Sequence, residues 1–183
     1  IRTLTLAIRA SMRTEDAPLI RLEDYRASDW LIDTVDLDVS LHPQKTRVRA
    51  LLALRPNPEG QPGAPLRLDG DELGLQSLAI DGKPLDASAY TVTPQALTLP
   101  NPPPHDFTLT IETELDPSAN TKLMGLYRSS KVYCTQCEAD GFRRITYFLD
   151  RPDVMSVYTV RLEAAKAEAP VLLSNGNLVA AAE

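Results

Sequence analysis

Apolar and polar residues alternate along much of the chain, and such alternation predicts β-strands whose two faces meet different surroundings. The clearest example is Trp30–Leu41, which reads WLIDTVDLDVSL. The apolar residues that fall mostly on one face of this strand are Leu31, Val35, Leu37, Val39 and Leu41. Further strands are expected within residues 46–56, 66–70, 75–85, 90–100, 106–117, 157–165 and 170–179.

Turn-forming residues separate these segments. The chain has 15 prolines and 8 glycines, which disfavour long helices and favour many short strands. The pairs Asp69–Gly70 and Asp81–Gly82 are typical of tight hairpin turns. Residues 70–78 are the one helix-like stretch. The pattern therefore predicts an all-β fold, a curved antiparallel sheet or β-sandwich with little helix.

Composition and charge narrow the classes of function. A chain of 183 residues is long enough for one domain with its own core. Its net charge of −6 argues against nucleic acid or an anionic membrane as a partner, because both attract clustered Lys and Arg. No apolar run is long enough to span a bilayer. Two cysteines do not make a disulfide scaffold, so we expect a cytoplasmic protein.

The first residues differ from the rest of the chain. Residues 1–11 are cationic, carry no acidic residue and lack the apolar core of a secretory signal. Met12 then opens a segment that reads like a natural beginning. We therefore expect residues 1–24 to be an N-terminal extension and residues 25–183 to form the β domain. The chain as a whole is expected to be a piece of a longer protein.

Both cysteines, Cys134 and Cys137, stand in the C-x-x-C spacing that zinc clips and redox pairs share. A structural zinc site usually needs four Cys or His ligands, but the only histidines are His42 and His105, both in turn-like contexts. A redox pair normally begins a helix, whereas the surroundings here are β and an acid follows the second cysteine. Packing in the interior is the favoured interpretation of both cysteines, with the zinc and redox alternatives still open.

Two polar residues flank the second cysteine. In an extended segment, Gln136 and Glu138 point to the same side, and Cys137 faces the other way. An amide oxygen and a carboxylate on one face suit a cation with several N–H donors, such as a free α-ammonium group. The alternative is a solvated surface on which these residues pair with Arg143 or Arg144.

Three stretches together carry a family resemblance. They are LMGLYRSS at residues 123–130, TQCEADGFRRITYFLDRPD at residues 135–153 and PVLLSNGN at residues 170–177. In this order they resemble the N-terminal domain of the aminopeptidase N family of zinc metallopeptidases, and they are closest to its bacterial cytosolic branch. The resemblance covers Tyr25–Glu183 and implies a saddle-like β domain.

The resemblance also implies roles for individual residues. Gln136 and Glu138 would line the first substrate subsite and bind the free amino terminus of a peptide. The Glu138–Ala139 peptide bond would be cis. By holding the α-ammonium, Glu138 would select the first peptide bond for cleavage, because an internal residue has no ammonium group to offer.

The family's catalytic elements are a G-A-M-E-N loop and an H-E-x-x-H motif with a distal Glu, and none of them occurs in residues 1–183. The resemblance therefore implies that the zinc ion and the catalytic residues lie beyond Glu183. This chain is expected to contain no catalytic residue and to bind no metal. Its expected partners are peptide substrates with a free N-terminus and the catalytic domain of the same polypeptide.

Residues 143–153, RRITYFLDRPD, alternate in a way that predicts a strand ended by Pro152. We interpret Asp150 and one of the two arginines, Arg143 or Arg144, as a structural pair near the domain junction, because arginine–carboxylate pairs often act as geometric clamps. A direct catalytic role is the alternative. For the chain as a whole, the alternative function is a non-catalytic β-sandwich that serves as a binding or interaction module.

Overall fold

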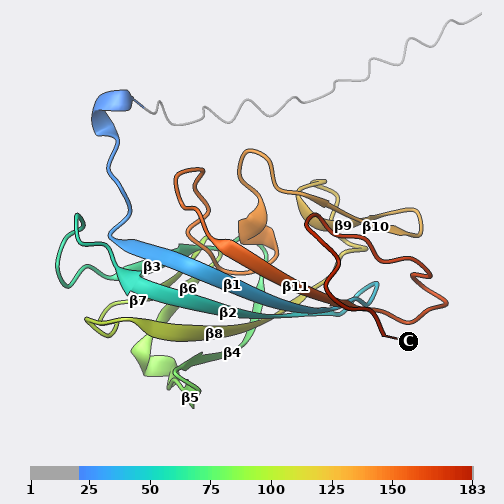
Figure 1. Ribbon diagram of the computed structural model, residues 1–183, viewed down its shortest axis with the longest axis horizontal. Coiled ribbons are helices and arrows are strands. Elements are labelled where there is room, and N and C mark those ends of the chain that lie inside the picture. Colours follow the sequence, from blue (N-terminus) through green and yellow to red (C-terminus); the bar gives the residue numbers. More distant parts are fainter. Residues whose placement is uncertain (1–20, 183) are drawn as a thin grey trace, which may run out of the picture.

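The computed structural model describes residues 21–182, whose strands form three sheets (Figure 1). The six-stranded sheet has the order β11-β1-β2-β8-β4-β5, the three-stranded sheet β3-β7-β6 and the two-stranded sheet β10-β9. The strands are β1 (Trp30–Ser40), β2 (Thr46–Pro56), β3 (Leu66–Asp69), β4 (Gly74–Ile80), β5 (Lys83–Pro84), β6 (Thr91–Thr93), β7 (Ala96–Leu99), β8 (Phe107–Leu115), β9 (Gly125–Ser129), β10 (Val132–Gln136) and β11 (Val157–Glu163).

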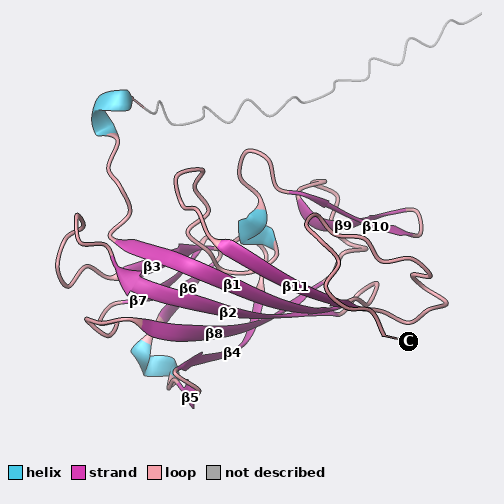
Figure 2. Cartoon of the chain, in the orientation of Figure 1, coloured by secondary structure: helices cyan, strands magenta, loops and turns pink. Residues whose placement is uncertain are grey.

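Helical structure in the described part of the chain is limited to short 3-10 turns, which Figure 2 shows beside the strands. They are η1 (Leu22–Asp24), η2 (Ala87–Ala89) and η3 (Phe142–Arg144). The expectation of an all-β fold with little helix is therefore confirmed.

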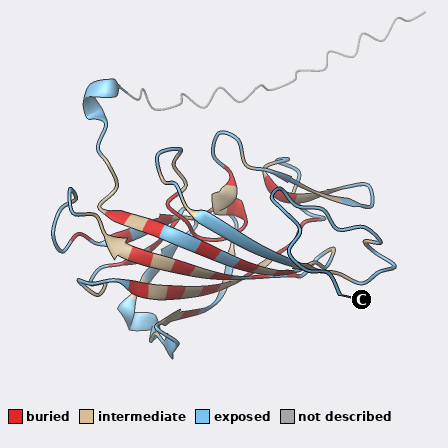
Figure 3. Cartoon of the chain, in the orientation of Figure 1, coloured by how far each residue is buried: buried red, intermediate tan, exposed pale blue. Residues whose placement is uncertain are grey.

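The alternation of the sequence is visible in the central strands as alternating burial (Figure 3). Every second residue of β8 from Phe107 to Leu115 is buried, and so is every second residue of β2 from Thr46 to Leu54. The leucines of β3 and β7 in the smaller sheet join the same buried cluster as the apolar residues of β1, β2 and β8. One core therefore holds the two larger sheets together, as the hydrophobic effect favours.

Strand β1 departs from simple alternation at one place. Its pairing with β2 shifts between Ile32 and Thr34, which marks a β-bulge or a similar irregularity. Because such an extra residue reverses the faces, Ile32 is buried with 1% of its surface exposed, whereas Leu31 is only partly buried. The expectation that Leu31 shares the inner face with Val35 is therefore wrong.

The two Asp-Gly pairs behave differently. Asp81 and Gly82 have φ values of 49° and 74°, and they join β4 to β5 as a tight hairpin. Asp69–Gly70 does not form a hairpin, because β3 pairs with β7 while β4 lies in the other sheet. The hairpin expectation is confirmed at the second pair and wrong at the first.

Several element expectations need correction. The helix-like stretch 70–78 contains most of β4, which pairs with β8 and so takes its conformation from the sheet. Residues 90–100 form the two strands β6 and β7 rather than one. Residues 170–179 form no strand. Strand β11 runs parallel to β1, so the six-stranded sheet is not purely antiparallel.

Residues 143–153 are also not a strand. The turn η3 ends at Arg144, and residues 145–149 are then buried one after another, without alternation. A single bridge joins Phe148 to Asp69. The apparent period of two fails because this segment is surrounded by the core on all sides, so polar and apolar positions do not face different environments.

The expected extension covers residues 1–24. Its first part, residues 1–20, lies outside the described residues. From residue 25 the chain is tied to a distant segment. The hydroxyl of Tyr25 donates to Asp153 Oδ2 at 3.0 Å, and Arg151 Nη2 donates to the carbonyl oxygen of Arg26 at 2.7 Å. These contacts bring residues 25 and 26 against the loop that follows Leu149.

Candidate functional site

The β9–β10 hairpin carries the segment that the sequence singled out. Gln136 is the last residue of β10 and pairs with Gly125, the first residue of β9. Gly125 has a φ of 69°, and a Cβ added there would lie 2.4 Å from the Cβ of Arg144. Only glycine allows the hairpin to approach η3 this closely, because any larger residue would be both strained and in contact with Arg144.

The two proposed anchor residues both lie on the surface. Gln136 and Glu138 are exposed, while Cys137 between them is partly buried and packs against the core. Gln136 Nε2 donates to the carbonyl oxygen of Glu138 at 3.5 Å, which places the amide beside Glu138. The Glu138–Ala139 peptide bond is cis. The Gln136 amide therefore lies beside the backbone of Glu138, and both side chains are exposed on one turn.

Asp150 contacts the loop that carries Glu138. Its Oδ2 accepts hydrogen bonds from the backbone N–H of Gly141 at 2.9 Å and of Arg143 at 3.2 Å. Arg143 Nε donates to the same oxygen at 2.6 Å, and Arg143 Nη2 donates to the backbone oxygen of Asp150 at 2.9 Å. The Asp150 side chain is only 9% exposed. Arg143 is thus the arginine that pairs with Asp150.

Arg144 belongs to a different cluster, although it is the next residue. Its guanidinium group pairs with Asp71 and Glu72, and its Nε donates to the carbonyl oxygen of Met124 at 3.2 Å. Lys122 Nζ lies 2.9 Å from Glu72, and the hydrogen bonds from Lys122 and Arg144 lower the pKa of the Glu72 carboxyl. No local sequence pattern indicates this cluster, because its carboxylates lie more than seventy residues before Arg144.

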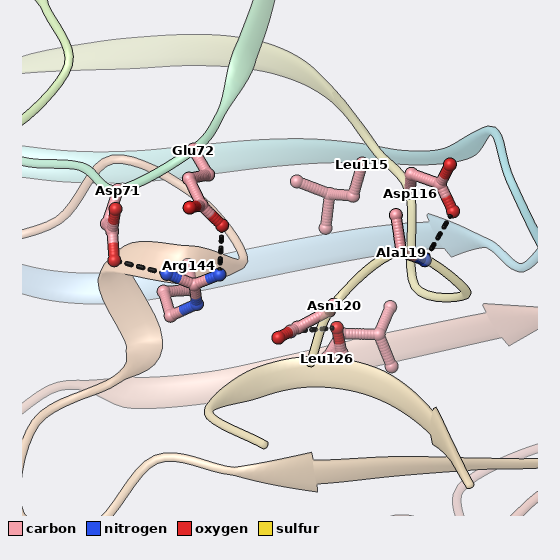
Figure 4. Close-up of a pocket in the computed structure, with 8 residues that line it drawn as sticks. All are labelled: Asp71, Glu72, Leu115, Asp116, Ala119, Asn120, Leu126 and Arg144. Atoms are coloured by element: carbon pink, nitrogen blue, oxygen red, sulfur yellow. Dashed lines mark hydrogen bonds and ion pairs between the residues drawn. The ribbon is translucent and has the colours of Figure 1, made fainter. Parts of the chain in front are cut away.

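Figure 4 shows Arg144 with Asp71 and Glu72 at one side of a cavity of about 210 Å³. The guanidinium group points between the two carboxylates, and Asn120 and Leu126 lie across from it. A second cavity, of about 250 Å³, lies between the start of β1 and the loop at Arg151. Neither of these two cavities is lined by Gln136 or Glu138, and both residues are exposed on the surface.

The two cysteines are free thiols, and both are partly buried. Burial, together with the nearby negative charge of Asp150, raises the pKa of the Cys137 thiol to about 11. A thiolate is the form that binds metals and attacks disulfides, so this environment opposes both of those roles for Cys137.

We expect Cys137 to react slowly with iodoacetamide. At pH 8 a thiol with a pKa of about 11 is ionised roughly a hundredfold less often than one with the ordinary value of 9, and its alkylation should be slower to match. The rate should keep rising as the pH is raised toward 11. The Cys134→Ala variant leaves Cys137 as the only thiol of the chain, and the Cys137→Ala variant is its control. Alkylation of Cys137 as fast as that of glutathione would contradict this view of its surroundings.

The described residues do not fit a zinc ion. Residues 21–182 contain no group of three or more His, Cys, Asp or Glu side chains that could hold a metal. His42 Nδ1 accepts hydrogen bonds from the backbone N–H groups of Gln44 and Lys45, both at 3.2 Å, and so stabilises the turn in which it lies.

Within residues 21–182, no helix is long and apolar enough to cross a membrane.

Comparison with known proteins places the chain in a family. Residues 32–183 match the peptidase M1 N-terminal domain. The chain is 52% identical over 169 residues to aminopeptidase N of Caulobacter vibrioides, which covers 92% of this chain and 19% of that protein. It is 48% identical over 161 residues to aminopeptidase N of Escherichia coli, covering 87% of this chain and 18% of that protein. The chain thus spans about a fifth of the length of these relatives.

Solved structures agree with this assignment. The crystal structure of Legionella pneumophila aminopeptidase A in complex with aspartic acid has a TM-score of 0.79 and 33% identity, covering 88% of this chain and 19% of that one. An M1 zinc metallopeptidase from Deinococcus radiodurans has a TM-score of 0.62 at 17% identity, covering 75% of this chain and 33% of that one, and this likeness concerns the fold alone. Sequence and fold agree, and the chain belongs to the peptidase M1 N-terminal domain family.

Proposed function

We propose that this chain is the N-terminal domain of a zinc-dependent aminopeptidase, called the full-length enzyme below, and that Gln136 and Glu138 bind the α-ammonium group of the peptide substrate. The observation that carries the proposal is the exposed pair of an amide and a carboxylate at the end of β10, with Cys137 turned inward between them. The names of the relatives support the aminopeptidase reaction. A cytoplasmic location, expected from the cysteine content, is part of the same proposal.

The chemistry of the anchor follows from its donors and acceptors. An α-ammonium group has three N–H donors, and a carboxylate accepts them with an opposite charge. Gln136 Nε2 donates to the carbonyl oxygen of Glu138. The Oε1 of the same amide can then accept a hydrogen bond from the α-ammonium group. A charge-assisted hydrogen bond of this kind contributes on the order of 1.5–3 kcal/mol once the site is closed to water. Binding the terminal amine fixes which peptide bond is presented for cleavage.

The open setting of the pair implies a second surface. Charged groups that remain in water interact weakly because solvent screens them. The full-length enzyme must therefore cover Glu138 if the anchor is to work, and we assign that cover to the part of the polypeptide that follows Glu183. We assign the zinc ion and the groups that activate water to that part as well, as the family resemblance implies. In support, residues 21–182 contain no group of three or more His, Cys, Asp or Glu side chains that could hold a metal.

The isolated chain of residues 1–183 is expected to hydrolyse no amino-acid anilide and to bind no stoichiometric zinc. The physical reason is that an anchor without a metal-bound water orients a substrate but cannot attack it. Metal analysis after dialysis and an anilide assay would check this. Recovery of tightly held zinc together with peptidase activity in the purified chain would contradict it.

The experiment that tests the proposal itself is steady-state kinetics of the Glu138→Ala variant of the full-length enzyme, with the zinc content measured on the same samples. A lower kcat/KM at an unchanged zinc content supports the anchor. Wild-type kinetics of this variant would contradict the anchor and would mean that Glu138 is an ordinary solvent-exposed residue.

A further inference from the structure

We infer that Asp150 is a positioning residue that holds the Glu138 carboxylate in place for the substrate amine. This inference rests on the function proposed above and adds a residue to it. Asp150 itself does not reach the exposed face on which Gln136 and Glu138 lie, since its side chain is only 9% exposed. It acts on the backbone of the loop between β10 and η3.

The loop that carries Glu138 is held at both of its ends. Glu138 lies in a short arc between Gln136, which is paired in the hairpin, and Gly141. The Asp150 carboxylate accepts from Gly141 N–H at 2.9 Å and from Arg143 N–H at 3.2 Å, so it fixes the far end of that arc. With one end in a strand and the other on a carboxylate, the arc has little freedom left.

The segment that carries Asp150 is fixed to the core. Two residues earlier, Phe148 exchanges backbone hydrogen bonds with Asp69 at the end of β3, at 2.7 and 3.1 Å. Leu149 is buried with 7% of its surface exposed. The carboxylate therefore stands on a segment that is fixed to the core, and not on a free loop. A residue on a rigid support can set the geometry of a neighbouring loop.

On the η3 side, Arg143 neutralises the Asp150 carboxylate and Phe142 packs against the core. Arg143 Nε donates to the Asp150 carboxylate at 2.6 Å, which compensates the charge where it is buried. The ring of Phe142 packs edge-on against Phe148 at 5.0 Å and against Tyr158 at 5.7 Å between centroids. These contacts hold η3 against the core. The arc that carries Glu138 therefore has a fixed end point.

A double-mutant cycle in the full-length enzyme separates positioning from general stability. Because misplacement of a binding group by about 1 Å can cost up to 10²-fold, we expect Asp150→Ala to lower kcat/KM by roughly tenfold for peptides with a free amino terminus. In the Glu138→Ala background the same substitution should change kcat/KM by less than about twofold, since the group it positions is gone. Zinc content should be that of the wild type throughout.

The matched control is Asp153→Ala. Asp153 lies three residues further on and pairs with Arg151 at 2.6 Å, but its contacts are with Arg151 and Tyr25 and not with the loop that carries Glu138. Its loss should leave kcat/KM within about twofold of the wild type in both backgrounds. If Asp150→Ala does not fold, Asp150→Asn takes its place, because the amide keeps the shape and one acceptor. It should show a smaller loss with the same dependence on Glu138.

The outcomes are distinct. An equal loss from the Asp150 substitution with and without Glu138 would overturn the positioning role and leave the anchor intact, and so would no loss at all in the wild-type background. Wild-type kinetics of Glu138→Ala would instead overturn the anchor, and the positioning role with it. A loss that depends on Glu138, with the Asp153 control unchanged, supports the inference.

Discussion

Glu138→Ala in the full-length enzyme is expected to lower kcat/KM for peptides with a free amino terminus by roughly 10–100-fold, at an unchanged zinc content. This range is the loss of one charge-assisted hydrogen bond in a closed site, on the order of 1.5–3 kcal/mol. Gln136→Ala should cost less, because the amide is a neutral partner. Steady-state kinetics of the two variants, with metal analysis of the same preparations, provides the measurement.

The control for this prediction is Glu59→Ala, which removes an exposed carboxylate from the loop between β2 and β3. It lowers the negative charge of the protein as much as Glu138→Ala does, so any general effect of charge on substrate attraction appears in both. The control should retain wild-type kcat/KM within about twofold. An equal loss in both variants would show that net charge, and not the anchor, is responsible.

Gly125→Ala is expected to lower the free energy of unfolding of the chain by about 2–4 kcal/mol. Two effects add at this residue. A φ of 69° strains any residue with a Cβ, and that Cβ would lie 2.4 Å from the Cβ of Arg144. The backbone would have to move to relieve the overlap. Urea unfolding followed by circular dichroism measures the loss.

Gly63→Ala isolates the backbone part of that effect, and the difference between the two variants gives the steric part. Gly63 has nearly the same φ, 71°, but a Cβ added there meets no atom within 4 Å. It should therefore lose only the backbone term, about 1 kcal/mol. Equal destabilisation by the two substitutions would mean that the hairpin does not press against η3 as described.

Much of the fold could be predicted from the sequence because one physical rule governs it. Strands with one face on the core and one toward water must alternate, and β2 and β8 do so without interruption. The rule fails where that condition fails. At Ile32 the pairing irregularity reverses the faces, and residues 145–149 are enclosed on all sides, so their spacing carried no information about a strand. The parallel β11 could not be foreseen, since alternation does not encode strand direction.

Part of the candidate site could be predicted from local sequence, and part depends on the tertiary fold. The partly buried Cys137 between exposed Gln136 and Glu138 agrees with a local period of two. The rest of β10 does not follow this period, since Cys134 is partly buried and Thr135 is exposed. The partners of Arg144 follow from the tertiary fold. The loop that carries Asp71 and Glu72 meets η3 next to the bridge between Asp69 and Phe148, and the N–H of Asp71 donates to the carbonyl oxygen of Arg143 at 3.0 Å. No short-range sequence pattern predicts these long-range contacts.

The most direct test of the central claim compares two competitive inhibitors that differ only in the α-ammonium group. The wild-type full-length enzyme should bind the ammonium-bearing inhibitor more tightly than its des-amino counterpart. In Glu138→Ala that preference should fall by roughly 10–100-fold, while the affinity for the des-amino compound stays nearly constant, because only the amine contacts the lost carboxylate. A preference that is undiminished in Glu138→Ala would contradict the assignment of Glu138 as the amine anchor.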